Sequence, residues 1–533
     1  MQDNQGIESY YDNAIRLEEE GHILEAIDSY QKAIEQSTDL PGVYTGLGDI
    51  LMDSGRLEES ERIYREGIQR FPNDSNLRND LYYLLSEVGR YEEALEHIEE
   101  AVRLRPDMGP YHYNVGNALS KLNRTEAAVA AYREAIRLEP EWAWAHFNLA
   151  LELWDLEKYD ESLTEVREAI RIDNADSDYW TELGEKLYAL DRFEEAVEAF
   201  EHAISLDSEN VDAYFWLGNS LEQLKQDQAC AHAFEQFNRI KHEDAEAHYR
   251  LAIAYDRLER FDEAIAEYRE VIRLEPENWW PYYNLGTIFY DQDKYAQAAE
   301  MYQKSIHLNP QDKDAYYCLG WCLWKTGELE SSIHAYQNHL GMEPDDSAAH
   351  HNLGLVFEEN GQLEEAVSEL TEAARLQPDD ADIHFDLADV LTKLCRWEEA
   401  EDENRQAIRL NPDCSYAHLN LGYILSEKDQ IDEAIAEFEE AIRLDPSDSI
   451  PYYYLGMALT EKGDVNKAIT AFQESMRLDP EDPEVLYRLG SLMYEDSRID
   501  EAHSLWENAS KLPDSEFSEL ARQALQDKHL KRN

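Results

Sequence analysis

Four side chains with metal-binding chemistry lie in one part of the sequence. Cys318 and Cys322 are one helical turn apart, and His350 and His351 follow further along the chain. A zinc site needs ligands that converge in a closed geometry. Because Cys318 and His350 fall in different columns of the repeat described below, we interpret all four as ordinary packing or surface residues. We expect no metal and no cofactor.

Sequence signatures of catalysis do not occur either. The chain has no phosphate-binding loop, no nucleophile elbow and no dinucleotide fingerprint. Pairs of carboxylates are frequent, but they carry no information in a chain with 115 acidic residues among 533. We therefore expect no catalytic residues and predict that this chain is not an enzyme.

The charge of the chain restricts its partners. The 115 acidic and 48 basic residues give a net charge of −67, which would repel the phosphates of nucleic acids and anionic membranes. We expect neutral or basic protein partners, no nucleic acid and no membrane. Two other interpretations stay open: the acid only solvates the outer surface of a long molecule, or it adapts the protein to high salt.

Location and redox state follow from what the sequence contains. It has no apolar run long enough to span a membrane, and its first residues show neither a basic nor an apolar stretch. The five cysteines are odd in number and scattered, which is typical of a reducing compartment. We expect a cytoplasmic protein.

The chain is built from an internal repeat of 34 residues, and repeats of this length are typical of solenoids. Three residue types recur at multiples of that period. The columns they form are alanine from Ala26 to Ala502, glycine from Gly48 to Gly490, and proline from Pro72 to Pro480.

Each repeat predicts two short antiparallel helices. In repeat 9, residues 279–312, apolar side chains follow helical spacing in two stretches, separated by a polar break at residues 291–294. Pro310 ends the second stretch, because proline cannot continue a helix. The glycine and alanine columns allow the two backbones to approach closely where the helices cross. The unit is therefore a helical hairpin.

This pattern resembles the tetratricopeptide repeat (TPR) family. The shared features are the small residue at position 8, the alanine at position 20, the proline at position 32 and an aromatic residue or histidine at position 4. The resemblance implies an all-α fold, a right-handed α-α superhelix or solenoid of helix-turn-helix hairpins. We expect a lead-in at residues 1–6, fifteen uninterrupted repeats at 7–516 and a capping helix at 517–533.

Several repeats depart from the pattern. Repeat 3 has Tyr82 where a small residue belongs, and repeats 5 to 7 end in Asn174, Ser208 and His242 instead of proline. Repeat 7 also has Cys230 in place of the alanine. We therefore predict looser packing, or a change of superhelical pitch, around residues 211–244.

The resemblance also indicates which residues line the inner wall of the superhelix, at positions 2, 5, 6, 9, 12 and 13. Position 5 is aromatic in most repeats, and an aromatic column can either bind a ligand or pack between neighbouring repeats. Aromatic residues are most concentrated in repeats 9 and 10. We predict a peptide-binding surface there formed by Trp280, Tyr283, Tyr290, Tyr317, Trp321 and Trp324.

Position 6 is asparagine in five repeats. A side-chain amide both donates and accepts hydrogen bonds, so it can hold an extended backbone without reading its sequence. The alternative is that these amides are only solvated. The predicted contacts are Asn114, Asn148, Asn284, Asn352 and Asn420.

These observations predict a protein-interaction scaffold that binds an extended peptide or a partner domain in its groove. The resemblance offers an alternative, a regulatory or substrate-targeting subunit of a separately encoded enzyme such as a transferase. The sequence identifies neither the partner nor the oligomeric state.

Overall fold

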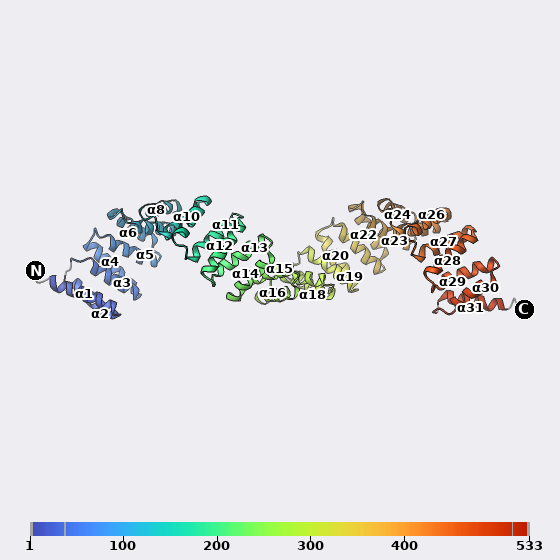
Figure 1. Ribbon diagram of the computed structural model, residues 1–533, viewed down its shortest axis with the longest axis horizontal. Helices are drawn as coiled ribbons and strands as arrows, with labels where there is room; N and C mark the ends of the chain where they lie inside the picture. The colour runs from blue at the N-terminus through green and yellow to red at the C-terminus, as the bar shows by residue number, and fades with distance from the viewer. Residues whose placement is uncertain (1–3, 37–38, 514, 530–533) are drawn as a thin grey trace. The chain divides into compact units, whose positions relative to one another are not determined.

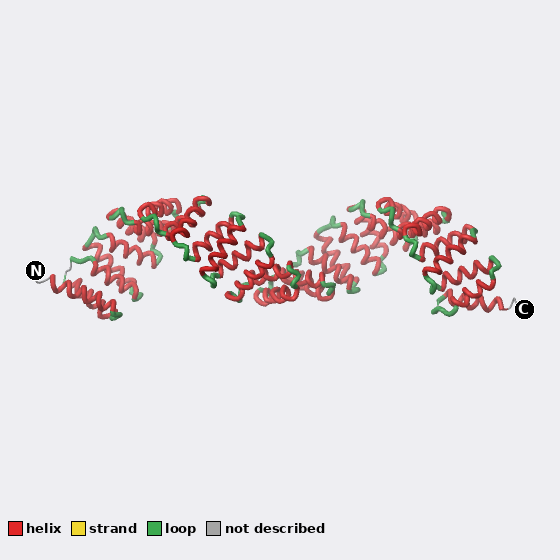
Figure 2. The backbone as a smooth tube through the Cα atoms, viewed as in Figure 1, coloured by secondary structure: helices red, strands yellow, loops and turns green. Residues whose placement is uncertain are grey.

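The computed structural model describes residues 4–36, 39–513 and 515–529. Within them the regular secondary structure is entirely helical (Figure 2). The first thirty helices form fifteen consecutive hairpins, and in fourteen of them the even-numbered helix contacts the odd-numbered one before it (Figure 1). The all-α solenoid fold is thereby confirmed. Residues 1–3 of the expected lead-in and 530–533 of the expected cap lie outside the described residues.

The chain divides into two compact units, residues 1–270 and 271–533, and the division falls within α16. The helices up to that point are α1 (Asn4–Glu19), α2 (Ile23–Glu35), α3 (Gly42–Asp53), α4 (Leu57–Arg70), α5 (Ser75–Glu87), α6 (Tyr91–Leu104), α7 (Gly109–Lys121), α8 (Thr125–Leu138), α9 (Ala143–Asp155), α10 (Tyr159–Ile172), α11 (Ser177–Ala189), α12 (Phe193–Leu206), α13 (Val211–Gln223), α14 (Asp227–Ile240), α15 (Ala245–Arg257) and α16 (Phe261–Leu274).

The second unit continues the same alternation. Its helices are α17 (Trp280–Asp291), α18 (Tyr295–Leu308), α19 (Lys313–Lys325), α20 (Leu329–Met342), α21 (Ser347–Glu359), α22 (Leu363–Leu376), α23 (Ala381–Lys393), α24 (Trp397–Leu410), α25 (Ser415–Glu427), α26 (Ile431–Leu444), α27 (Ser449–Lys462), α28 (Val465–Leu478), α29 (Pro483–Glu495), α30 (Ile499–Ala509) and α31 (Glu516–His529). The last helix packs against α29 and α30.

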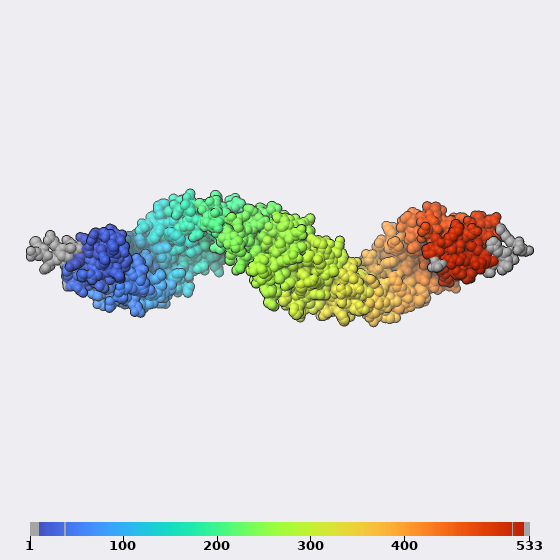
Figure 3. All heavy atoms as spheres, turned by 90° about the horizontal axis from the view of Figure 1, so that it is seen from below, coloured from blue at the N-terminus to red at the C-terminus, as the bar shows by residue number. Residues whose placement is uncertain are grey.

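The two helices of a hairpin cross at a glycine and an aromatic ring. In repeat 4, a Cβ atom added to Gly116 would lie 2.5 Å from the ring of Tyr132, at position 24. The same close approach occurs in most repeats with glycine at position 8, which explains the glycine column. Repeat 3 reverses the arrangement: Tyr82 supplies the ring from the first helix, and the smaller Ile98 occupies position 24, both buried. The side chains fill the space between the ribbons (Figure 3).

Turn geometry sets where the second helix begins. Position 15 has positive φ in all fifteen hairpins, including Gly89 in repeat 3 (φ 75°) and Asn123 in repeat 4 (φ 54°). The next N–H bonds back to the first helix, as Arg124 N does to the Leu119 carbonyl at 2.9 Å. This is the left-handed cap that commonly ends helices.

Part of the acidity is required by the helices themselves. Position 34 is aspartate or asparagine in many repeats, and it caps the next first helix. The Asp74 carboxylate, for example, accepts hydrogen bonds from the N–H groups of Asn76 and Leu77, each at 3.0 Å. An anion at this end also complements the helix dipole.

Candidate functional site

Within each unit, first helices of neighbouring hairpins lie side by side, and we call the surface they form the first-helix face. Within the first unit α3 contacts α5 and α11 contacts α13. In the second unit, α19, α21, α23, α25 and α27 contact one another in succession. This face carries the residues for which we predicted binding.

The aromatic residues at position 5 belong largely to the hydrophobic packing. Seven of them lie against the ring at position 24 of their own hairpin, with centroids 5.6–6.1 Å apart. Tyr283 packs on Tyr302 and Tyr317 on Tyr336 in this way. Both tyrosines are half-buried, so a ligand could reach only part of each ring.

The amides at position 6 link neighbouring repeats. The Asn148 amide donates to the hydroxyl of Tyr113 at 2.8 Å, and the Asn352 amide donates to that of Tyr317 at 2.9 Å. In both pairs the acceptor is the position-5 residue of the preceding repeat. Sequence reasoning missed this role because it requires two adjacent columns to be read together.

The other three amides differ in their surroundings. Asn114 donates to the Asn79 side chain at 2.8 Å and is only 2% exposed, so it is not accessible to a peptide. Asn284 is half-buried. The Nδ2 atom of Asn420 is buried and has no hydrogen-bond partner among the described residues. The preceding repeat has Phe385 at position 5, which offers no hydroxyl.

Trp280 is the most accessible residue of the predicted surface, whereas Trp321 and Trp324 are half-buried. Trp280 is 48% exposed and stacks on Trp279 with a centroid separation of 3.9 Å. Trp321 and Trp324 meet edge to face at 5.4 Å. Stacking and edge contacts hold these rings in fixed orientations.

Charged groups surround the second tryptophan pair. The Lys325 ammonium lies 4.6 Å from the Trp321 ring centroid and 5.0 Å from that of Trp324, which are cation–π distances. The Trp324 Nε1–H donates to the Glu359 carboxylate at 2.6 Å. Tyr290, from α17, packs instead on Tyr295.

The cysteines and histidines with metal-binding chemistry do not converge. Burial raises the pKa of Cys318, and it raises that of Cys322 to about 12, so both thiols stay protonated. His350 and His351 each face a carboxylate of their own, Glu369 and Asp386. Among the described residues, no three metal-binding side chains come together.

Position 2 also exposes apolar side chains that sequence reasoning overlooked. Tyr416 is 59% exposed and Ile450 is 48% exposed, in consecutive repeats of the second unit. Trp280 and Trp144 occupy the same position. A search of this column for large apolar residues would have found Tyr416 and Ile450.

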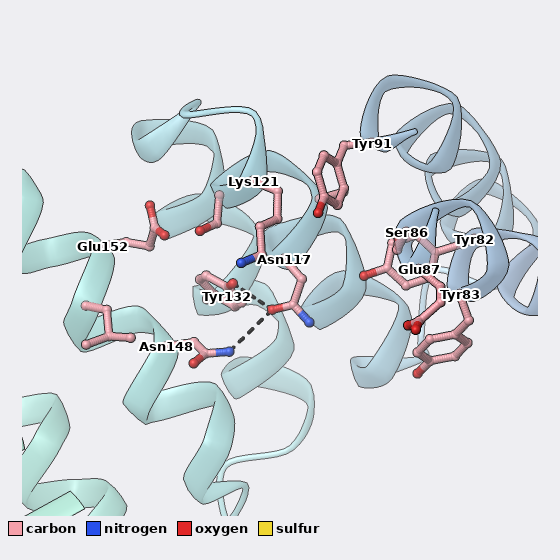
Figure 4. A pocket seen from close by; sticks show the side chains of 13 residues that line it. Tyr82, Tyr83, Ser86, Glu87, Tyr91, Asn117, Lys121, Tyr132, Asn148 and Glu152 are labelled. Atoms are coloured by element: carbon pink, nitrogen blue, oxygen red, sulfur yellow. Dashed lines mark hydrogen bonds between the residues drawn. The ribbon is translucent and has the colours of Figure 1, made fainter. Parts of the chain in front are cut away.

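A pocket opens on the first-helix face of the first unit. It has a volume of about 420 Å³ and lies between α5, α7 and α9, with further side chains from α6 and α8 (Figure 4). Its lining is polar and aromatic. The labelled residues are Tyr82, Tyr83, Ser86, Glu87, Tyr91, Asn117, Lys121, Tyr132, Asn148 and Glu152.

The pocket has a fixed floor and an unusual carboxylate. The Asn117 side-chain oxygen accepts hydrogen bonds from the Tyr132 hydroxyl at 2.7 Å and from the Asn148 amide at 3.3 Å (Figure 4). Glu152 is only 7% exposed. Burial raises the pKa of its carboxyl group, and a hydrogen bond from Ser120 partly opposes that rise.

No described helix is both long and apolar enough to cross a bilayer. The curated proteins with which the sequence was compared include no match.

Several solved structures are distantly similar to the chain. "YrrB: a TPR protein with an unusual peptide-binding site" is 23% identical, with a TM-score of 0.33, and the match covers 38% of this chain and 100% of YrrB. Yeast Tom70 is 16% identical, with a TM-score of 0.32, covering 86% of this chain and 96% of Tom70. The Naa15/Naa10 complex bound to HypK-THB is 12% identical, with a TM-score of 0.35, covering 98% and 96%.

Family models match along nearly the whole chain. Models described as tetratricopeptide repeat match residues 17–81, 83–108, 147–204, 212–239, 283–347, 323–381, 358–405, 385–449 and 437–470. A model described as TPR repeat matches residues 116–156, 184–225, 257–293 and 456–497. Together with the fifteen hairpins, these matches show that the chain belongs to the tetratricopeptide repeat family.

Proposed function

We propose that the protein is a non-catalytic interaction scaffold, and that its first-helix face binds a neutral to basic extended segment of a partner protein. The aromatic surface of repeats 9 and 10 anchors that segment. It consists of Trp280, Tyr283, Tyr290, Tyr317, Trp321 and Trp324. The observation that carries the proposal is the exposure of Trp280, a large ring held in place by Trp279 yet half open to solvent.

Rigid, exposed aromatic rings favour binding for an energetic reason. A tryptophan buries a large area and has few rotatable bonds, so ordering it costs little entropy. Stacking of Trp280 on Trp279 and the edge contact of Trp321 with Trp324 reduce that cost further. The surface is therefore organised before a partner arrives.

The charges around these rings favour a neutral or basic segment. Lys325 covers Trp321 and Trp324, but it is itself exposed and can be displaced. A lysine or arginine of the partner could take its place over the rings, beside the Glu359 carboxylate. An acidic segment would meet the strongly negative charge of the chain.

The half-buried amides of Asn148, Asn284, Asn352 and Asn420 are secondary contacts in this proposal. Asn352 uses one amide hydrogen to link repeats and retains the rest of the group for a ligand. Asn148 donates to both Tyr113 and Asn117, so only its side-chain oxygen is left for a ligand. Asn114 is left out of the proposed contacts because it is buried.

Affinity capture from the native lysate tests the proposal with three immobilised proteins. These are the wild type, the triple variant Trp280→Ala/Trp321→Ala/Trp324→Ala, and the control Trp144→Ala. The control removes a ring of equal exposure, 47%, at position 2 of repeat 5. We expect one partner to be held by the wild type and the control and lost by the triple variant.

Circular dichroism of the three proteins should be the same, and hydrogen exchange of the captured complex should show protection on α17 and α19. A partner held equally by the triple variant would contradict the proposal, and so would protection confined to the even-numbered helices.

A further inference from the structure

The pocket of the first unit lies beside the hairpin in which the glycine and aromatic positions are reversed. Tyr82, the residue that breaks the repeat pattern, is part of its wall, and Tyr132, from the regular crossing of repeat 4, is also part of it. The pocket therefore lies between two helix crossings that differ in which helix supplies the large side chain. We propose that this pocket binds the cationic side chain, lysine or arginine, of an extended partner segment.

The buried carboxylate of Glu152 is the first reason. It lines the pocket, is more than nine-tenths buried and forms no ion pair with any described residue. Burying a carboxylate without a cation is costly, because the interior solvates the charge poorly. The interaction with Ser120 offsets only part of that cost, since the pKa of the carboxyl group is still raised. An ammonium or guanidinium group in the pocket would supply the missing charge.

The remaining walls suit an organic cation. Tyr82, Tyr83, Tyr91 and Tyr132 all line the pocket, and the faces of aromatic rings attract cations. Ser86 adds a hydroxyl group to the same wall.

The pocket is also organised in advance. Asn117 holds Tyr132 and Asn148 together through the two hydrogen bonds to its side-chain oxygen. A ligand therefore need not order the floor, which lowers the entropy cost of binding.

Lys121 is the one group in the lining with the same charge as the proposed ligand. It is exposed, and no described carboxylate forms an ion pair with it, so its side chain can turn toward solvent. Its presence makes the sign of the ligand testable. Neutralising Lys121 should raise the affinity of the pocket for a cationic ligand and lower its affinity for an anionic ligand.

The proposal rests on the proposed function only in taking the cation from a partner protein, so small probes can test it separately. The probes are the Nα-acetyl N-methylamides of lysine, norleucine and glutamate, which share a backbone and differ in charge. Binding to the full chain is measured by ligand-observed NMR at about 150 mM salt, where long-range attraction is screened. The variants are Glu152→Gln and Lys121→Gln.

We expect the wild type to prefer the lysine probe over norleucine. Glu152→Gln should weaken lysine binding by about tenfold or more, as expected for a lost hydrogen bond to a charged group. Lys121→Gln should strengthen it. The matched control Glu126→Gln, an exposed carboxylate on α8, should change nothing. Thermal unfolding of each variant checks that the fold is intact.

Equal binding of lysine and norleucine would overturn the proposal, as would equal losses in Glu152→Gln and Glu126→Gln. Preference for the glutamate probe, abolished by Lys121→Gln, would also overturn it. The triple tryptophan variant should bind the lysine probe normally because its changes lie in the other unit. Loss of partner capture with intact probe binding would therefore separate the two proposals.

Discussion

Repeats 3 and 4 solve the same packing problem in opposite ways. Repeat 4 places Gly116 on the first helix beneath the ring of Tyr132 on the second. Repeat 3 places Tyr82 on the first helix and the smaller Ile98 on the second. Both crossings pair one large with one smaller residue, and either helix can supply the large one. The pocket of the first unit lies where the arrangement changes between repeats 3 and 4.

The largest expected effect comes from giving repeat 4 the arrangement of repeat 3, with the large residue on the first helix. Gly116→Tyr alone should lower the free energy of unfolding of repeat 4 by about 3 kcal/mol, because the new side chain collides with Tyr132. Tyr132→Ile alone should cost about 2–3 kcal/mol through the cavity it leaves. The double variant should recover at least about 1 kcal/mol of the sum.

Hydrogen exchange of repeat 4 amides measures these changes locally, since a repeat array need not unfold in one step. Strictly additive losses would mean that repeat 3 relies on something other than the exchange of large and small residues.

Repeats 4 and 5 provide a second contrast at position 4. His146 faces two acceptors: the Glu165 carboxylate at 2.6 Å from Nδ1 and the Pro140 carbonyl at 3.0 Å from Nε2. Both nitrogens can donate only in the imidazolium form. Burial alone would lower the pKa of His146, but these bonds outweigh it and, with the charges of Glu165 and Glu168, raise the pKa.

A folded-state pKa above the unfolded value of about 6.5 means that the stabilisation is complete below that pH. It is lost as the pH rises through the folded-state pKa. We expect repeat 5 to lose about 1–2 kcal/mol between pH 6 and pH 9, the scale of a hydrogen bond to a charged group. NMR titration of the ring and hydrogen exchange would measure it.

His112 of repeat 4 is the natural control. Its ring contacts the Pro106 carbonyl at 3.0 Å, and Ala131 stands where repeat 5 has Glu165. Glu165→Gln should remove most of the pH dependence of repeat 5. An equally steep loss in repeats 4 and 5 would contradict the role of the paired acceptors. The His248 and His418 pairs, with Glu267 and Glu437, should behave like His146.

Substitution of two amides at position 6 should change the stability of the protein in opposite directions. Asn148→Leu should destabilise the junction of repeats 4 and 5 by about 1 kcal/mol, because the Tyr113 hydroxyl loses its donor. Asn420→Leu should be neutral or stabilising by up to about 1 kcal/mol, because it removes a buried donor without a partner. Denaturant unfolding with local fluorescence would measure both. Equal losses would mean that the amide of Asn420 is bonded in solution.

The smallest expected effects concern position 15. Gly89→Ala in repeat 3 should cost about 1 kcal/mol, because a Cβ atom is disfavoured at positive φ. Asn123→Gly in repeat 4 should change stability by less, since asparagine tolerates this conformation. Thermal unfolding of the two variants would rank their losses of stability. A larger loss for Asn123→Gly would show that the Asn123 side chain has another role.

The hairpin fold was predictable because each repeat states the same pattern independently. Gly286, Tyr302 and Pro310 of repeat 9 place both helices and their crossing, and the structure confirms them. The compensation of Tyr82 by Ile98 was not predicted, since a single column cannot show which helix supplies the large side chain. The looser packing expected around residues 211–244 remains a prediction, although Cys230 is fully buried there.

The candidate site was harder to predict than the fold. Position within the repeat identified the first-helix face but not how far each side chain is exposed. Tyr317, for instance, is covered in part by Tyr336 and bonded to Asn352, contacts that depend on neighbouring helices. Tyr416 and the pocket around Glu152 went unnoticed because neither repeats with the period.

The amides that link neighbouring repeats have a consequence for synthesis of the chain. Asn148 reaches back to Tyr113 and Asn117, both one repeat earlier. A junction can therefore form as soon as the next first helix leaves the ribosome, without waiting for distant sequence. At about 5–20 residues per second, a new 34-residue repeat would dock roughly every 2–7 s. Because contacts this local fold quickly, the growing chain exposes only one unpaired hairpin surface at a time.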